Sequence, residues 1–336
     1  MAGLALMAAL IATAVPAAAP IYTGWSPGVN LGSTINSPFR DTGPAISADG
    51  LSLYFDSDRP GGLGGRDFWV SQRASVDDAW GTPVNLGATI NSPLVDAQPS
   101  FSPDGHRMFF TSTRSGGLGG NDLYQSYRAD IHDDFGWQAP TNLGAGVNTA
   151  GGDFSASYFE NEGGAPQLIF GSDRLEPGNS DWYMSELQAD GSWGPATSIP
   201  ELNSPFNEGH PTVRRDGLEI YFHRGIALGL SATDLWVATR ASVDDPWSAP
   251  VNVGAPVNSD RTDQDAYLSA DAKTLFYDSS RFEGSGGFDI YMSTREQILP
   301  TAKDECKQGG WVRFGVFENQ GDCVSYFATG GKDQPG

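Results

Sequence analysis

An asparagine followed five residues later by a carboxylate occurs five times in this chain, and its regular spacing limits the possible folds more than any other feature. The five pairs are Asn36/Asp41, Asn91/Asp96, Asn148/Asp153, Asn203/Glu208 and Asn258/Asp263. Successive asparagines are 55, 57, 55 and 55 residues apart, and a tryptophan recurs with the same period. A constant period of this length is typical of stacked supersecondary units. We therefore predict a chain of five repeats.

Each repeat contains four short apolar segments separated by turns. The second segment is aromatic in every repeat, as in Met108-Phe109-Phe110, and a tight turn such as Ser102-Pro103-Asp104-Gly105 precedes it. Short apolar runs bounded by turns fit strands that are buried on both faces. The 43 glycines and 22 prolines also favour an all-β chain rich in turns. Four strands in each of five units predict an all-β, five-bladed β-propeller with four-stranded antiparallel blades.

The order of the segments predicts how this propeller closes. The chain enters with an outer-strand segment at residues 25–31, and the repeats end with three inner strands that finish near Ser293. The last blade is therefore expected to take its outer strand from the N-terminal side of the chain. We expect the propeller to occupy residues 21–297, with a signal peptide at 1–19 and a C-terminal tail at 298–336.

Residues 1–19 form an apolar stretch with small residues around Ala17 and Ala19. This pattern is typical of a secretory signal, with a short membrane anchor as the alternative. The rest of the sequence contains no run long enough to be a transmembrane candidate. We expect a secreted or cell-surface protein, and in an exported chain Cys306 and Cys323 are expected to form a disulfide.

The formal net charge is −21, from 41 acidic and 20 basic residues. This charge argues against nucleic acid and anionic membrane surfaces as partners, because phosphate contacts need clustered lysine and arginine. Cations, or neutral ligands such as sugars, are better electrostatic matches, although the charge can simply keep a secreted protein soluble. We expect a monomer that contacts a carbohydrate or a protein at the cell surface.

Several short motifs of the second repeat resemble the WD40-like repeat of TolB-type propellers. They are Ser102-Pro103-Asp104-Gly105, Ser112-x-Arg114, Gly116 to Gly120, and Asp122-Leu123-Tyr124. The resemblance covers about residues 25–297 and implies the propeller fold, but it implies little about activity. The tail from Cys306 to Gly331 is similar to a short terminal segment of secreted bacterial proteins, which implies a location and no chemistry.

The repeats place acids and bases on one face of the predicted propeller. The carboxylates that begin the inner strands are expected to ring the central channel, and they are Asp41, Asp96, Asp153, Glu208 and Asp263. The loops between the second and third strands supply Arg59, Arg114, Arg174 and Arg281 to the same face. Neighbouring carboxylates about 5 Å apart would repel by roughly 3 kcal/mol at an effective dielectric of about 20. These pairs can therefore serve as structural braces or as a ligand-binding ring.

Departures from the repeat are concentrated in the fourth and fifth units. Ile226 stands where Arg59 is expected in the fourth unit, while His223 and Arg224 come early, so Glu208 is expected to lack an arginine. Two residues after the ring position, these units carry His210 and Asp265. Residues two apart on a strand share a face. A polar cluster at the channel mouth is therefore predicted, and ordinary drift of a repeat is the alternative.

The members of this predicted cluster that we consider as ligand-binding residues are Glu208, His210, His223, Asp263 and Asp265. Four of them, Glu208, His210, Asp263 and Asp265, are also candidate metal ligands. Their oxygen atoms would favour Ca²⁺ over Zn²⁺. We expect no cofactor other than such a structural calcium ion.

Two functions and a structural role remain open from the sequence. The leading prediction is a non-catalytic module that binds a carbohydrate, a wall polymer or a protein through its channel mouth, because no Gly-x-Ser-x-Gly or His-Glu-x-x-His motif is present. The alternative is a glycoside hydrolase, by analogy with arabinanase-type five-bladed propellers. Glu208 would then be the acid and Asp41 or Asp96 the base. A purely structural surface module is the third possibility.

Overall fold

The computed structural model describes residues 20–160, 164–176, 178–225 and 233–329. The predicted signal peptide lies outside the described residues. The chain forms two compact units. One unit is Gly24–Glu296, and the other combines the residues up to Thr23 with those from Gln297 onward.

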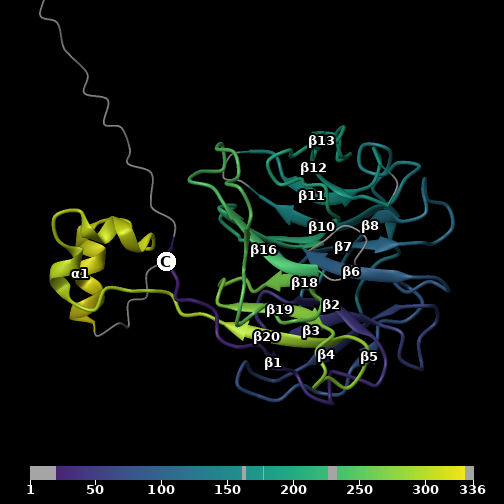
Figure 1. Cartoon of the computed structure of the whole chain (residues 1–336), viewed down its shortest axis with the longest axis horizontal. Helices are drawn as coiled ribbons and strands as arrows, with labels where there is room; N and C mark the ends of the chain where they lie inside the picture. The colour runs from purple at the N-terminus through teal and green to yellow at the C-terminus, as the bar shows by residue number, and fades with distance from the viewer. Residues whose placement is uncertain (1–19, 161–163, 177, 226–232, 330–336) are drawn as a thin grey trace, which may run out of the picture. The chain divides into compact units, whose positions relative to one another are not determined.

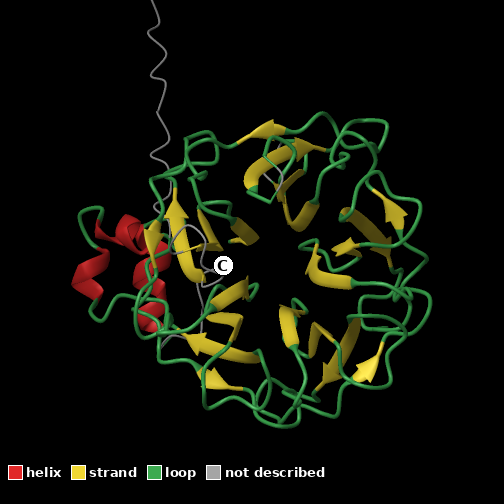
Figure 2. Cartoon of the chain, turned by 45° about the vertical axis from the view of Figure 1, so that its right-hand side comes forward, coloured by secondary structure: helices red, strands yellow, loops and turns green. Residues whose placement is uncertain are grey.

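The unit Gly24–Glu296 contains five antiparallel sheets of four strands, arranged radially around one axis (Figure 2). Blade 1 consists of β2 (Asp41–Ile46), β3 (Ser52–Ser57), β4 (Asp67–Gln72) and β5 (Val84–Asn85). Blade 2 consists of β6 (Asp96–Phe101), β7 (Arg107–Ser112), β8 (Asp122–Tyr127) and β9 (Thr141–Asn142). Blade 3 consists of β10 (Asp153–Phe159), β11 (Gln167–Ser172), β12 (Asp181–Glu186) and β13 (Thr197–Ser198).

Blade 4 consists of β14 (Glu208–Val213), β15 (Glu219–Gly225), β16 (Thr233–Thr239) and β17 (Val251–Asn252). Blade 5 consists of β18 (Asp263–Leu268), β19 (Thr274–Ser279), β20 (Asp289–Thr294) and β1 (Val29–Asn30). In this last blade Val29 pairs with Met292 and Asn30 with Tyr291, so the N-terminal strand closes the ring (Figure 1). The predicted five-bladed propeller and its closure are confirmed.

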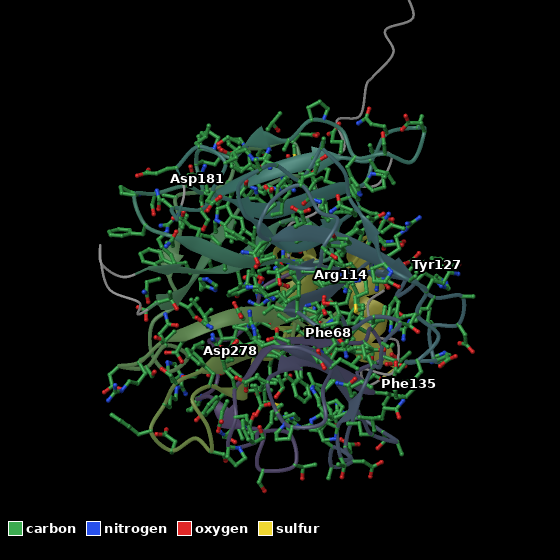
Figure 3. All side chains as sticks on the ribbon, turned by 90° about the vertical axis from the view of Figure 1, so that its right-hand side faces the viewer. Phe68, Arg114, Tyr127, Phe135, Asp181 and Asp278 are labelled. Carbon is green, nitrogen blue, oxygen red and sulfur yellow. A yellow bond between two sulfur atoms is a disulfide. The ribbon has the colours of Figure 1, made fainter. Side chains whose placement is uncertain are left out.

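Apolar side chains of the second and third strands form the core between the blades. Phe68, Met108 and Phe110 pack with Tyr54 in one cluster that joins blades 1 and 2, and Figure 3 shows the position of Phe68 inside the unit. All four side chains are completely buried. Burial on both faces follows from the radial stacking, because each sheet is covered by a neighbour on either side.

The repeated asparagines clamp the linkers between blades onto the third strands. Asn148 Oδ1 accepts from Leu123 N–H at 2.8 Å, and Asn148 Nδ2 donates to Leu123 O at 2.9 Å. Asn91 and Asn258 contact Phe68 and Leu235 in the same way. A simple turn-forming role would have the asparagines bond their own local backbone. Here the partner strand lies more than 20 residues away, so each asparagine joins distant segments.

The tryptophans keep the same period because four of them stack on a repeated arginine near the end of a third strand. The arginine carbon Cζ lies 4.2–4.5 Å from the indole centroid in each pair, and the pairs are Arg73/Trp80, Arg128/Trp137, Arg240/Trp247 and Arg295/Trp25. Cation–π contacts of this geometry are favourable when they are partly desolvated. They fasten the outer loops to the blades.

The second unit contains two 3₁₀ helices, η1 (Lys303–Cys306) and η2 (Gly310–Phe314), and one α-helix, α1 (Gln320–Ala328). Cys306 and Cys323 form a disulfide with Cα atoms 5.7 Å apart, as predicted. Both cysteines are fully buried in a small cluster with Phe314 and Phe317. Among the described residues, no helix has the length and apolar character needed to cross a membrane.

Candidate functional site

The five carboxylates at the starts of the inner strands lie at one end of the propeller, which we call the carboxylate face. Four of them are aspartates held in nearly identical braces. In blade 2, Arg114 Nη2 donates to Asp96 Oδ1 at 2.6 Å and to Ile90 O at 2.6 Å. Ser112 donates to the same carboxylate oxygen at 2.6 Å, and Ser92 N–H donates to Oδ2 at 2.6 Å.

The same brace recurs as Arg59/Asp41, Arg174/Asp153 and Arg281/Asp263. The carboxylates are completely buried, whereas the arginines are only slightly exposed. Each brace connects the start of an inner strand to the second-to-third-strand loop and to the preceding linker. The structure therefore uses these eight residues to hold the blades, as in the bracing alternative, and the ligand-binding ring stays a prediction. The role of Asp41 or Asp96 as a catalytic base stays a prediction.

Glu208 is braced differently from the four aspartates. Its predicted lack of an arginine is wrong, because Arg224 Nε donates to Glu208 Oε1 at 2.9 Å and Arg224 Nη2 donates to Leu202 O at 2.6 Å. Arg224 reaches this place from β15, directly across the strand pair from Glu208. Ser204 Oγ also donates to Oε1. Oε2 has no hydrogen-bond partner among the described residues.

The environment of Glu208 favours its protonated form. The residue is only 1% exposed. Burial raises the pKa of Glu208 to about 7, although the hydrogen bond from Ser204 and the charge of Arg224 oppose this shift. A carboxyl group that titrates near neutral pH can both hold and release a proton under physiological conditions.

Glu208 lines a large cleft of about 1040 Å³ at the carboxylate face, which we call the Glu208 cleft. Blade 3 supplies Phe154, Ser155 and the loop around Asp173–Ser180, and blade 4 supplies the linker Pro205–Asn207 and His223. Gln98 of blade 2 completes the wall toward the axis. A cleft of this size can hold a ligand of a few sugar rings.

The inner strands carry a β-bulge at the third residue, and the bulged residues surround the axis. All five have positive φ between 50° and 60°, and they are Gly43, Gln98, Ser155, His210 and Asp265. In four blades a second-strand side chain bonds the bulged backbone N–H of the next blade. The acceptors are Asp56, Thr111, His223 and Asp278. The blades are thus linked in sequence around the channel.

His223 and Asp265 form a pair beside the Glu208 cleft. His223 Nδ1 lies 3.2 Å from Asp265 Oδ1 and 3.3 Å from Asp265 N. Burial alone would raise the pKa of Asp265, but the imidazoles of His210 and His223 lower it overall, so that Asp265 is ionised. His210 is also buried, and its pKa is lowered because burial disfavours the charged imidazole. The predicted proximity of His210, His223 and Asp265 is therefore observed.

Two further carboxylates in the channel were not among our predicted site residues. Asp56 and Asp278 are completely buried, and burial raises the pKa of both, with Asp278 raised further by the charge of Asp265. Arg66 Nη1 contacts Asp56 Oδ2 at 3.0 Å, while Asp278 Oδ2 has no partner among the described residues. The sequence could have identified them, because Asp56 and Asp278 each directly follow the aromatic segment of their repeat. The other repeats carry Thr111, Gly171 and His223 at this position.

The four candidate metal ligands are divided among different partners. Glu208 bonds Arg224 and Asp263 bonds Arg281, whereas His210 and Asp265 lie at the axis. Within the described ranges, no group of three or more His, Cys, Asp and Glu side chains could hold a metal ion. The structural calcium ion remains a prediction.

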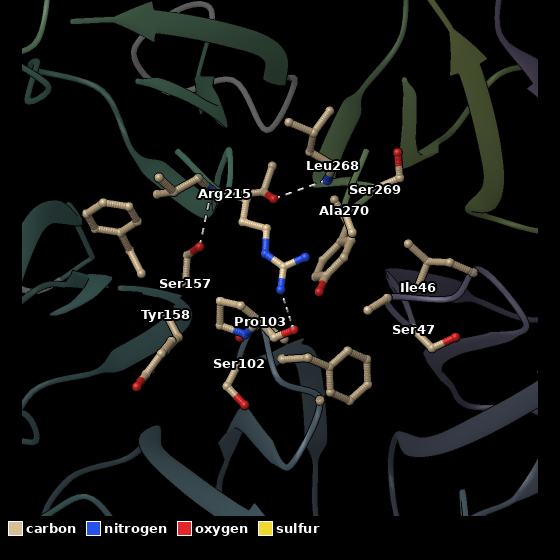
Figure 4. Close-up of a pocket in the computed structure, with 18 of the residues that line it drawn as sticks. Ile46, Ser47, Ser102, Pro103, Ser157, Tyr158, Arg215, Leu268, Ser269 and Ala270 are labelled. Carbon is tan, nitrogen blue, oxygen red and sulfur yellow. Dashed lines mark hydrogen bonds between the residues drawn. The ribbon is translucent and has the colours of Figure 1, made fainter. Parts of the chain in front are cut away.

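The opposite end of the channel is nearly filled by side chains. The inner strands end there at the turns between first and second strands, and the remaining cavity measures about 80 Å³. Figure 4 shows the Arg215 guanidinium projecting among Pro103, Ser157 and Ile46, and Arg215 Nη2 donates to Pro103 O at 3.2 Å. The Glu208 cleft therefore has far more room for a ligand than this end.

No family model and no curated protein sequence matches the chain, but several solved structures are similar to it. An α-L-arabinofuranosidase from Lactobacillus brevis is 13% identical, with a TM-score of 0.55, over 78% of this chain and 92% of its own. An endo-arabinase from Bacteroides thetaiotaomicron is 15% identical, with a TM-score of 0.54, over 82% of this chain and 98% of its own. An α-L-arabinofuranosidase from Podospora anserina is 14% identical, with a TM-score of 0.52, over 83% of this chain and 98% of its own.

At this identity the likeness establishes the fold. The similar structures are nevertheless mostly glycoside hydrolases, including a family-43 enzyme and an arabinanase from Bacillus subtilis. This finding overturns our leading prediction of a non-catalytic binding module and our inclination against an enzyme. It favours the alternative that we drew from the sequence, a glycoside hydrolase.

Proposed function

We propose that this protein is a glycoside hydrolase whose reaction takes place in the Glu208 cleft, with Glu208 as the proton donor. The main support is the state of Glu208 itself. It is the one inner-strand carboxylate of the five with a longer side chain, and its Oε2 lacks a partner among the described residues. Its pKa is raised to about 7, and it lines a cleft of about 1040 Å³ at the carboxylate face. Glycosidic bond cleavage needs such an acid, because the leaving oxygen must be protonated.

The second group in the proposed mechanism is the His223–Asp265 pair. Nδ1 accepts from Asp265 N–H in one tautomer of His223. The proposed step uses the other tautomer, in which Nδ1 carries the proton 3.2 Å from Asp265 Oδ1 and Nε2 is the acceptor. His223 lines the same cleft as Glu208 but comes from the neighbouring strand β15. In the proposed step Glu208 transfers its proton to the glycosidic oxygen as the carbon–oxygen bond breaks. Water adds to the anomeric carbon, and His223 takes the proton that this water loses.

The proposal is tested by assaying hydrolysis by residues 20–336 on aryl glycosides and polysaccharides. α-L-Arabinofuranosides are the first substrates to try, because several structurally similar proteins are arabinofuranosidases. Sugar release by the wild-type protein that is lost in Glu208→Asp would support the proposal. Turnover that is unchanged in Glu208→Asp, or no release from any glycan by a correctly folded protein, would contradict it.

The finer classification and the location of the protein are also proposals. We infer that the repeats are of the WD40-like type found in TolB propellers, which is supported by the motif from Ser102 to Gly105 and by Ser112-x-Arg114. We further propose that the protein acts outside the cytoplasm. The disulfide between Cys306 and Cys323 supports this, because such bonds persist in oxidising compartments.

A further inference from the structure

Phe154 is a fixed aromatic surface within the Glu208 cleft. It is the second residue of β10, directly after the braced Asp153, and its side chain is partly exposed in the cleft. One edge of its ring packs on Gly152, where a Cβ atom would come within 2.7 Å of Cε1. The other edge packs on Gly171, where a Cβ atom would lie 3.1 Å from Cδ2. The two glycines therefore hold the ring in one orientation.

Blades 3 and 4 place their large side chains in reciprocal positions. In blade 3, Phe154 pairs across the strands with Gly171. In blade 4 the small residue is on the inner strand, since Gly209 pairs with His223. A Cβ atom on Gly209 would lie 2.2 Å from His223 Nε2. In each blade a glycine thus leaves space for the aromatic or imidazole ring opposite it, and both rings line the same cleft.

The other described residues of the cleft supply hydrogen-bonding groups and negative charge. Asp173 and Glu176 supply the negative charge, because Glu208 favours its protonated form, and neither lysine nor arginine occurs among the described residues that line the cleft. Asn207 Oδ1 accepts from Ser180 N–H at 2.8 Å, and its amide NH₂ makes no bond within the described part of the chain. Amides and carboxylates beside an aromatic face are suited to the hydroxyl groups and the apolar face of a sugar.

We propose that the Glu208 cleft selects uncharged saccharides, with one sugar ring stacked on Phe154, and rejects saccharides that carry carboxylates. The exclusion follows from charge. A uronate would enter a cleft lined by Asp173 and Glu176 on a protein of net charge −21, and the described lining offers no cationic side chain to compensate for it. This inference rests on the proposed function for the location of the site, but it concerns binding and selectivity.

The test measures binding separately from turnover. Glu208→Asp serves as the background, because an aspartate at this position restores the residue found in the other four blades. This variant should fold normally, and its shorter carboxyl group should be held in the brace and be unable to donate a proton to the substrate. Calorimetric titration with neutral arabino-, xylo- and cello-oligosaccharides is compared with titration with oligogalacturonate. Phe154→Ala and Gly171→Ala are then introduced separately into this background. The methyl group of Gly171→Ala would displace the Phe154 ring. Phe135→Ala is the matched control, because Phe135 is an exposed phenylalanine on an outer loop far from Asp278 of the channel (Figure 3).

The proposal predicts that at least one neutral oligosaccharide binds and that oligogalacturonate does not. Phe154→Ala should weaken that binding by about tenfold or more, corresponding to about 1.4 kcal/mol, while Phe135→Ala leaves it unchanged. Gly171→Ala should also weaken it, although Phe154 is intact. Binding of oligogalacturonate as tight as that of the neutral sugars, equal binding by Phe154→Ala, or no binding of any saccharide would overturn the inference. Neutral sugar binding without turnover by the wild-type protein would instead refute the proposed catalytic function alone.

Discussion

Arg224 donates to one oxygen of Glu208 and leaves the other without a partner among the described residues. In the four other blades an arginine donates to one aspartate oxygen, joined in blades 1 to 3 by a serine, and a backbone N–H donates to the second oxygen at 2.6 Å. The extra methylene of glutamate moves the carboxylate away from that backbone donor. The added methylene group is therefore the difference between the aspartates, which act as structural braces, and Glu208, which can transfer a proton.

Replacing Glu208 with aspartate is expected to abolish hydrolysis without destabilising the propeller. The shorter carboxylate should accept from Ser204 N–H as Asp96 accepts from Ser92 N–H, so both oxygens would be bonded. We expect a loss of activity of at least about 100-fold, in the range of general acid catalysis, and a melting temperature no lower than that of the wild type. Activity assays and circular dichroism check the two parts, and Glu186→Asp on the exposed edge of blade 3 is the control.

The rate of hydrolysis should fall as the pH rises through about 7. The proton donor must be protonated, and burial raises the pKa of Glu208 to about 7. Above that pH the rate should decrease about tenfold per pH unit. A profile of kcat/KM against pH with no falling limb between pH 6 and 8 would exclude Glu208 as the acid.

The same titration should appear in stability. The raised pKa means that the folded state favours the neutral carboxyl, so this contribution is complete below about pH 4.5 and is lost as the pH rises through about 7. Glu208→Gln, which cannot ionise, should therefore gain stability relative to the wild type between pH 5 and pH 8. One pKa unit corresponds to about 1.4 kcal/mol, which limits the gain to about 3 kcal/mol. Urea unfolding at the two pH values measures it.

Glu219 should stabilise the junction between blades 4 and 5. It accepts from Arg295 Nη2 at 2.6 Å, from Arg214 Nη1 at 3.2 Å and from Tyr221 Oη at 3.0 Å, and it is largely buried. Removing one partner of a buried ionic network typically costs about 3–5 kcal/mol. We expect Glu219→Gln to unfold at a lower urea concentration at pH 7, whereas the exposed control Glu186→Gln should not.

The pH dependence of the Glu219 contribution has the opposite sign to that of Glu208. Burial raises the pKa of Glu219, but Arg295 and Arg214 outweigh it and lower the pKa overall. The stabilisation is therefore present above the ordinary value of about 4.5 and is lost as the pH falls below it. The difference in stability between the wild type and Glu219→Gln should shrink in acid. A difference that is constant from pH 7 to pH 3 would contradict this assignment.

The disulfide should stabilise the small helical unit and leave the chemistry of the cleft unchanged. The two cysteines are 17 residues apart, and closing a loop of this length contributes roughly 3 kcal/mol in the chain-entropy model. The double variant Cys306→Ser, Cys323→Ser should lose protection from proteolysis in residues 297–329, as measured by mass spectrometry. Hydrolysis by the variant should match that of the wild type.

The sequence by itself determined the number of blades, the strand order and the closure by the N-terminal strand. These features depend on local patterns with a constant period, such as aromatic strands and asparagine-to-carboxylate linkers, which are visible without any contact. It also identified Glu208 as the unusual member of the ring. We expected Glu208 to lack an arginine, which was wrong, because Arg224 lies opposite it at the cross-strand position where the other blades carry a serine.

Only the tertiary structure decided which acids are braced and which remain chemically available. Asp41, Asp96, Asp153, Asp263 and Glu208 occupy equivalent positions of the repeat, and each accepts from an arginine of a distant segment. The distinction lies in whether the second carboxylate oxygen also finds a donor. The channel carboxylates Asp56 and Asp278, and the pairing of His223 with Asp265, likewise arise from contacts between different blades. Burial and hydrogen bonding set the protonation of a carboxyl group, and both are produced by the packing of segments that are far apart in the chain.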